Sequence, residues 1–145
     1  MQFSQDVNVM AYVIRSYGPG EIIINEPLSP NQIDSETRAA ERGKSFQKKI
    51  LTESVVVSSE RLMEHWPPQH VDQLIAPHLT QLLELSPEIV LIGTGKSLQW
   101  PPAAALQPLR DNNIGIEVMD TAAACRTYNI LMLEGRRVAA ALMMI

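Results

Sequence analysis

A glycine-rich turn, Gly93-Thr94-Gly95-Lys96-Ser97, follows a short apolar run and has residue types that can hold an anion. The phosphate loop of nucleotide-binding proteins needs another glycine five positions before Gly95, and Val90 stands there. The dinucleotide fingerprint needs a glycine where this chain has Leu98. Two interpretations remain. The amides of the two glycines hold a small anion, with the lysine supplying charge, or the glycines only form a tight turn.

A second polar turn, Asp120-Thr121, also follows an apolar run and precedes a helical segment. If both runs are parallel strands, their ends lie at one edge of a sheet, where ligands commonly bind. Helix N-termini at such an edge favour anions. The sequence therefore predicts a ligand crevice between the two turns, into which the helix adds the charge of Arg126 and the hydroxyl of Tyr128. The crevice residues are Gly93, Thr94, Gly95, Lys96, Asp120, Thr121, Arg126 and Tyr128. The alternative is structural: the second turn caps the helix, and the arginine and tyrosine pair or pack within the fold.

Neither the one cysteine nor the three histidines completes a catalytic or metal site. Cys125 stands near a helix start beside Arg126, and both features lower the pKa of a thiol, but no histidine motif supplies a base. His65, His70 and His78 are separated by intervals that do not match a helical zinc pair. We therefore expect a buried, unreactive cysteine, no metal, no cofactor and no catalytic residue. Whether the chain is an enzyme stays open, with binding favoured.

The elements that position these turns can be identified in the last third of the chain. Residues 89–92 and 138–145 are apolar runs that predict strands, and residues 116–119 predict the strand between them. Residues 102–112 and 121–134 separate the strands as helices. Two consecutive strand–helix–strand units require right-handed crossovers and a parallel core. Gly135 is expected to end the second helix. The last run is apolar throughout, which predicts a central strand.

The first half predicts antiparallel and surface elements. Residues 10–17 and 21–25, around Gly18-Pro19-Gly20, indicate a hairpin that extends or covers the sheet. Residues 55–57 predict a strand, 58–64 a capped helical turn, and 71–85 a helix kinked or split at Pro77. Residues 27–49 are rich in charge and proline and predict a mobile surface excursion. The expected fold is a single three-layer α/β domain over residues 1–145, with a mixed sheet, a parallel Rossmann-like core and an N-terminal antiparallel hairpin.

Composition excludes several classes of protein. The 145 residues are 46% apolar, enough for one domain with a real core. A net charge of −4 argues against a nucleic-acid partner. One cysteine excludes an internal disulfide and fits a reducing compartment. The chain shows no secretory signal pattern and no apolar run of the ~20 residues needed to span a bilayer. We expect a soluble cytoplasmic protein and leave homo-oligomerisation open.

Surplus apolar residues point to a protein-binding surface. Positions 130–133 hold four consecutive apolar residues, which turn through about 400° of a helix and cannot all face one core. The helix is therefore covered on two sides or carries an exposed patch. The patch, with a tryptophan from the glycine-rich turn, would consist of Trp100, Met132 and Leu133.

Several stretches together resemble one family: YGPGEIIIN, RLMEHWPP, GTGKSLQWPP, IGIEVMDTAAACRTYNIL and EGRRVAAAL. It is the uncharacterised family of small bacterial and archaeal proteins whose mitochondrial member is a respiratory complex I assembly factor. The resemblance implies a three-layer domain with a Rossmann-like core and no established catalytic residues. It also implies that the protein acts by binding other proteins, such as subunits of membrane or respiratory complexes. A small-molecule or anion site in the crevice is the alternative function.

Overall fold

The computed structural model describes residues 10–27 and 47–145, and its centre is a five-stranded sheet with the order β5-β4-β8-β6-β7. The parallel strands are β6 (Ile89–Thr94), β7 (Gly115–Met119) and β8 (Val138–Met143). The antiparallel strands are β4 (Val55–Ser58) and β5 (Leu62–Met63). The predicted parallel core and its mixed sheet are confirmed, and β8 is the middle strand.

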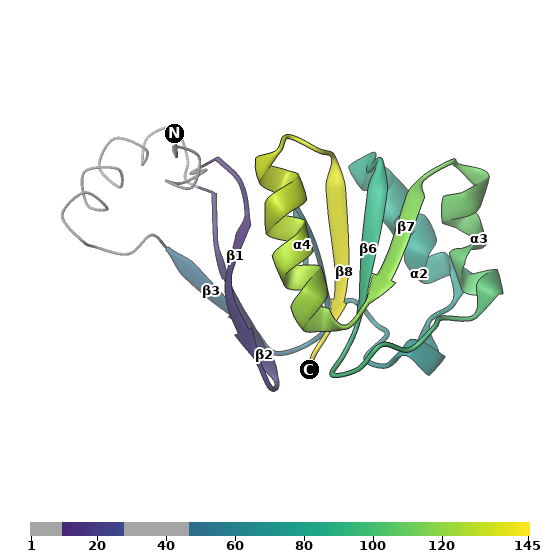
Figure 1. Ribbon diagram of the computed structural model, residues 1–145, viewed down its shortest axis with the longest axis horizontal. Helices are drawn as coiled ribbons and strands as arrows, with labels where there is room; N and C mark the ends of the chain where they lie inside the picture. The colour runs from purple at the N-terminus through teal and green to yellow at the C-terminus, as the bar shows by residue number, and fades with distance from the viewer. Residues whose placement is uncertain (1–9, 28–46) are drawn as a thin grey trace.

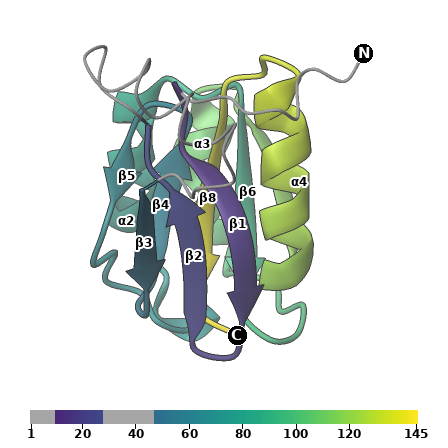
Figure 2. The same cartoon turned by 90° about the vertical axis from the view of Figure 1, so that its left-hand side faces the viewer.

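A second, three-stranded antiparallel sheet lies over the first (Figure 2). It contains β1 (Val13–Gly18), β2 (Glu21–Asn25) and β3 (Lys48–Leu51). The predicted hairpin is therefore correct, and it covers the large sheet rather than extending it. The predicted excursion over residues 27–49 is wrong at its end, because Lys48 and Lys49 pair with β2. Residues 28–46 lie outside the described part of the chain.

Helices complete the layers on both faces of the five-stranded sheet (Figure 1). The long helix α4 (Thr121–Leu133) lies beside the N-terminal sheet on one face. The other face carries η2 (Val71–Gln73), α2 (Ala76–Thr80), η3 (Gln81–Leu85) and α3 (Ala103–Asp111). The result is three layers with two hydrophobic cores, one on each side of the central sheet.

Strand β8 contributes to both cores, because successive side chains of a strand point to opposite faces. Val138 and Leu142 pack in the core under α4, whereas Met143 packs in the core under α2 and α3. The small residues between them, Ala139 to Ala141, are all fully buried. Covering on both faces explains why this run is apolar at every position.

Two predicted helical segments differ in the structure. The segment after β4 is a tight turn into β5, in which Ser58 Oγ accepts a hydrogen bond from the Arg61 amide and Ser58 N donates to the Arg61 carbonyl. The serine chosen as a helix cap therefore stabilises a hairpin, a role serine also fills. The run 71–85 is split, as predicted, but at Leu74 and Ile75 rather than at Pro77, which stands in the first turn of α2, where no backbone donor is needed. His78 Nδ1 accepts a hydrogen bond from the Ile75 amide and caps this short helix.

Candidate functional site

The two predicted turns meet at the carboxyl ends of the parallel strands, where hydrogen bonds join them. The hydroxyl of Thr121, the first residue of α4, accepts from the Gly95 amide at 2.8 Å and donates to the Met143 carbonyl at 2.6 Å. The Thr121 amide in turn donates to the Gly95 carbonyl at 2.9 Å. Thr121 is fully buried. It therefore connects β6, β8 and α4 at one point.

Gly93 is required at this junction by the close approach of α4 to β6. A Cβ at this position would lie 2.9 Å from Thr121 Oγ1 and 3.0 Å from Thr121 Cα. Gly95 has a φ of +97°, a conformation that favours glycine. Both glycines of the motif thus have structural reasons to be glycine, as the second of the two interpretations held.

The helix start at the second turn is also satisfied within the protein. Asp120 is the N-cap of α4, and its carboxylate accepts a hydrogen bond from the Ala123 amide at 2.9 Å. Thr121, considered as a cap from the sequence, is instead inside the helix. Gly135, with a φ of +82°, ends the helix as predicted. The Gly95 and Ala123 amides are therefore occupied by protein oxygens, and Lys96 is exposed nearby.

The loop after β6 is held rigidly while it exposes two large apolar side chains. Thr94 Oγ1 donates to the Ser97 carbonyl at 2.7 Å and accepts from the Gln99 amide at 3.1 Å. Pro101 is buried and anchors the far end. Between these anchors, Leu98 is 50% exposed and Trp100 is 72% exposed. We call residues 96–102 the tryptophan loop.

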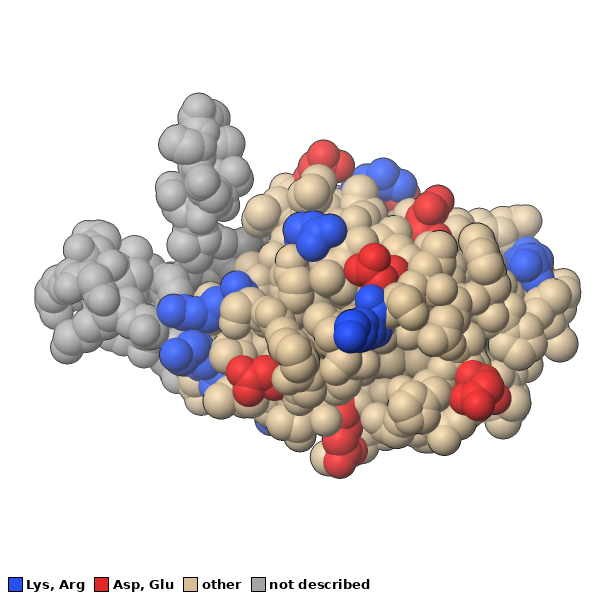
Figure 3. All heavy atoms as spheres, turned by 60° about the horizontal axis from the view of Figure 1, so that its bottom comes forward, with Lys and Arg blue, Asp and Glu red and all other residues tan. Residues whose placement is uncertain are grey.

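Charged residues of both signs are scattered over this edge of the molecule (Figure 3). Figure 3 turns the lower edge of Figure 1 toward the viewer and shows Lys and Arg interspersed with Asp and Glu. No continuous basic surface of the kind that binds phosphate backbones is visible on this face.

The other two predicted crevice residues lie farther along α4 and contact the N-terminal sheet. Arg126 Nη1 donates to the hydroxyl of Tyr17 at 2.9 Å. Tyr128 is fully buried, and its hydroxyl donates to the Tyr12 carbonyl at 2.8 Å. Burial raises the pKa of the Tyr128 phenol far above its usual range. The structure therefore brings six of the eight crevice residues together at the sheet edge and places Arg126 and Tyr128 in the contact between α4 and the N-terminal sheet.

Asn129 strengthens the same contact between α4 and the N-terminal sheet. Among the sequence motifs it appears only within the stretch that resembles the family. Its Oδ1 accepts from the Ile14 amide at 2.9 Å, and its Nδ2 donates to the Ile14 carbonyl at 2.7 Å. A side-chain amide thus pairs with one residue of β1 as a neighbouring strand would. The bulge of β1 between Ile14 and Ser16 stands at this place.

The three predicted partner-surface residues have different environments. Trp100 is the most exposed, Leu133 is 40% exposed, and Met132 is buried at 4%. Met132 belongs to the core under α4, so that part of the predicted surface is corrected. Ile130 and Leu133 are the exposed apolar residues of α4. They lie toward its C-terminal end, whereas the tryptophan loop meets its N-terminus.

The cysteine is inert by burial. Cys125 is fully buried in the core between α4 and the sheets. Burial raises the pKa of its thiol to about 12, and the nearby Arg126 only partly opposes that effect. Within residues 10–27 and 47–145, no cluster of His, Cys, Asp and Glu could hold a metal ion. In the same ranges, no helix is long and apolar enough to span a membrane.

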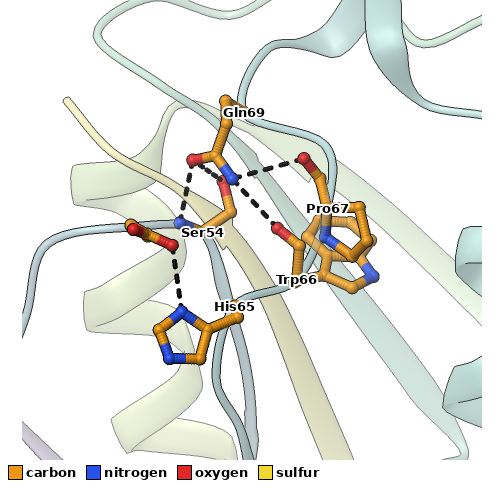
Figure 4. A network of polar contacts seen from close by, with 6 residues as sticks. Ser54, His65, Trp66, Pro67 and Gln69 are labelled. Carbon is orange, nitrogen blue, oxygen red and sulfur yellow. Dashed lines mark hydrogen bonds and ion pairs between the residues drawn. The ribbon is translucent and has the colours of Figure 1, made fainter.

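Figure 4 shows a polar network that joins the turn before β4 to the loop after β5 and that no sequence motif indicates. Gln69 Oε1 accepts from both the amide and the hydroxyl of the buried Ser54, while its Nε2 donates to the carbonyls of Trp66 and Pro67. One glutamine thus fixes two loops against each other. The adjacent His65 has a φ of 59° and pairs with Glu53 at 3.0 Å, a hydrogen bond that raises the pKa of the imidazole.

A family model described as a protein of unknown function (DUF498/DUF598) matches residues 36–143. The human NADH dehydrogenase (ubiquinone) 1 alpha subcomplex assembly factor 3 is 46% identical over 61 residues, which cover 42% of this chain and 33% of that protein. The 13 kDa major membrane protein of Francisella tularensis is 29% identical over 85 residues, or 58% of this chain and 69% of that protein. A crystal structure from Bordetella parapertussis superposes with a TM-score of 0.72 at 30% identity, covering 94% of this chain and 98% of that one.

The chain thus spans about a third of the length of the assembly factor, and its own fold accounts for nearly all of the bacterial structure. The family model covers well over half of the 145 residues. The protein therefore belongs to this uncharacterised family, which includes the mitochondrial assembly factor, as its sequence motifs predicted.

Proposed function

We propose that the protein is an accessory factor that binds a subunit of a respiratory or membrane complex through the tryptophan loop. The observation that carries the proposal is the combination of rigidity and apolar exposure in residues 96–102. Thr94 and Pro101 fix the ends of the loop, and Trp100 remains 72% exposed between them. An exposed aromatic side chain on a fixed loop is typical of an interface anchor, because binding then costs little conformational entropy of the loop.

The relatives indicate the kind of partner. One is named an assembly factor of a respiratory NADH dehydrogenase, and another a membrane protein. The proposal extends this role to the present chain and takes a complex subunit as its partner. It places the protein in the cytoplasm, because a chain with one cysteine forms no internal disulfide and fits a reducing compartment.

The test compares gene complementation by matched variants in a host strain that lacks the protein. Leu98→Ala with Trp100→Ala removes the apolar side chains of the loop, while Ile75→Ala removes a side chain that is 55% exposed at the start of α2. Truncation of an interface anchor costs roughly 2 kcal/mol or more, about 30-fold in affinity. We expect the wild type and Ile75→Ala to restore the NADH dehydrogenase band on native gels and the loop variant to fail. Equal restoration by the loop variant, at equal protein level, would overturn the proposal.

The second candidate function, an anion site between the two turns, has less support. The Gly95 and Ala123 amides that would hold the anion donate to Thr121 and Asp120 instead. Lys96 is the exposed cation of this edge. Saturable binding of inorganic phosphate that Lys96→Gln abolishes would favour this function over protein binding.

A further inference from the structure

A pocket of about 380 Å³ opens at the end of the central sheet opposite the tryptophan loop. It lies where α4 ends and β8 begins, next to the turn between β4 and β5, and Ser58 pairs with Ala139 there. The loop from α4 to β8 is at the top of Figure 1, whereas β6 ends at the bottom. The volume falls within the range of small-molecule sites, roughly 300–1,000 Å³. Neither of the functions proposed above uses this pocket.

Two consecutive arginines line the pocket, and the protein orients both guanidinium groups through Nε. Arg136 Nε lies 3.3 Å from Glu88 Oε2. Arg137 Nε donates to the Ser86 carbonyl at 3.1 Å, and the Arg137 amide donates to Glu88 Oε1 at 2.9 Å. Ser86 has a φ of 48°, which fixes the direction of its carbonyl as η3 ends. Each guanidinium is thus held from one side.

The terminal nitrogens of both guanidinium groups have no protein partner within residues 10–27 and 47–145. Arg136 keeps 44% of its side chain exposed, and Arg137 is exposed. A guanidinium bound at Nε still presents donors in the planar fork that matches carboxylate and phosphate oxygens. This arrangement orients the donors before any ligand arrives.

The rest of the lining is polar at the rim and apolar at the floor. Ser58 and Ser59 stand at the rim, and Leu85, Met132 and Val138 form the apolar part. Met132 and Val138 are buried at 4% and 3% exposure, so they belong to the core below the pocket. Glu60 also lines the pocket and is exposed. The carboxylate of Glu88 is balanced by Arg136 and by the Arg137 amide.

We propose that this pocket binds a small organic oxyanion, a phosphate ester or carboxylate attached to an apolar body. Arg136 and Arg137 hold the oxyanion, Ser59 adds a hydroxyl at the rim, and the floor contacts the apolar body. The pocket is too large for a bare phosphate to fill, and Leu85, Met132 and Val138 in its lining offer a contact for an apolar group. Both arguments favour an amphipathic anion.

The experiment is an NMR titration of the ¹⁵N-labelled protein with phenyl phosphate, inorganic phosphate and neutral phenol. We expect saturable shifts of the Ser59, Gly135 and Val138 amides with phenyl phosphate, weaker binding of inorganic phosphate, and none of phenol. Arg137→Gln should weaken phenyl phosphate binding about tenfold, because a charge-assisted hydrogen bond is lost. Arg15→Gln, which removes an exposed arginine on β1, is the matched control and should bind as the wild type does.

Arg137→Gln keeps the backbone hydrogen bond to Glu88 and loses only an exposed hydrogen bond to the Ser86 carbonyl, so its thermal midpoint should stay close to that of the control. Ser59→Glu is the second variant: it keeps both arginines and should abolish binding by placing a carboxylate at the rim. Linear shifts without saturation, or wild-type affinity in both Arg137→Gln and Ser59→Glu, would overturn the proposal. Loss of the tryptophan-loop function leaves this binding unchanged, because the two surfaces lie at opposite ends of the sheet.

Discussion

Replacing Thr121 by valine should be among the most destabilising conservative changes in the chain. Valine has nearly the same shape, so the substitution opens no cavity and removes only the hydroxyl. That hydroxyl accepts from the Gly95 amide and donates to the Met143 carbonyl, and the residue is fully buried. Each hydrogen bond contributes about 1 kcal/mol net, and an unpaired buried group costs ~1–3 kcal/mol. We therefore expect a loss of roughly 2–4 kcal/mol of unfolding free energy.

The assay is urea unfolding followed by circular dichroism, with Thr127→Val as the matched control. Thr127 lies on the same helix, is half-buried, and has no side-chain hydrogen bond within the described residues. Its substitution should change stability by about 0.5 kcal/mol or less. Thr121→Ser, which keeps the hydroxyl, should recover most of the loss. If Thr121→Val and Thr127→Val unfold at the same urea concentration, the reasoning about this junction is wrong.

Three further predictions concern the core around α4. Gly93→Ala should lower the free energy of unfolding by about 1–3 kcal/mol, because the new Cβ would collide with the fixed Thr121 side chain. Thermal unfolding of the variant measures this loss. Tyr128→Phe should cost roughly 1–2 kcal/mol in the same assay, because the Tyr12 carbonyl loses its donor; an unchanged midpoint would refute that role. The Cys125 thiol should resist thiol reagents in the native protein and react once urea unfolds it. Because the thiol pKa is about 9 in the unfolded chain and about 12 in the folded protein, the free energy of unfolding contains a contribution that is fully present below about pH 9 and is lost as the pH rises to about 12. Cys125→Ala should therefore reduce the fall in stability over this pH range.

The sheet and its crossovers could be predicted because a strand that is buried on both faces is apolar at consecutive positions. The runs that became β6 and β8 are continuously apolar, and the glycines and proline between elements mark the turns. Strand β3 was missed because an edge strand needs only alternate apolar residues. Lys48, Lys49 and Ile50 point outward or lie at the rim, and Leu51 is the buried residue.

The positions of the α4 side chains were within reach of the sequence but were not deduced from it. Cys125, Tyr128 and Met132 are spaced by three and four residues, so they share one face of the helix. A buried cysteine on this face therefore favours the packed alternative for the tyrosine and argues against the methionine as part of a partner surface. The sequence includes Trp100 in a hypothetical exposed patch but does not decide its exposure, because a tryptophan before two prolines packs or projects according to hydrogen bonds that only the fold reveals.

The most direct test of protein binding through the tryptophan loop places a photo-crosslinking amino acid at position 98 in host cells. Trp100 stays intact in this variant, and a second variant carries the crosslinker at position 75, which is exposed at the start of α2 and lies outside the tryptophan loop. The account predicts a crosslink from position 98 to one subunit of a respiratory or membrane complex, its loss when Trp100→Ala is added, and no such product from position 75. A product that persists after Trp100→Ala, or the absence of any product from position 98, would contradict the account.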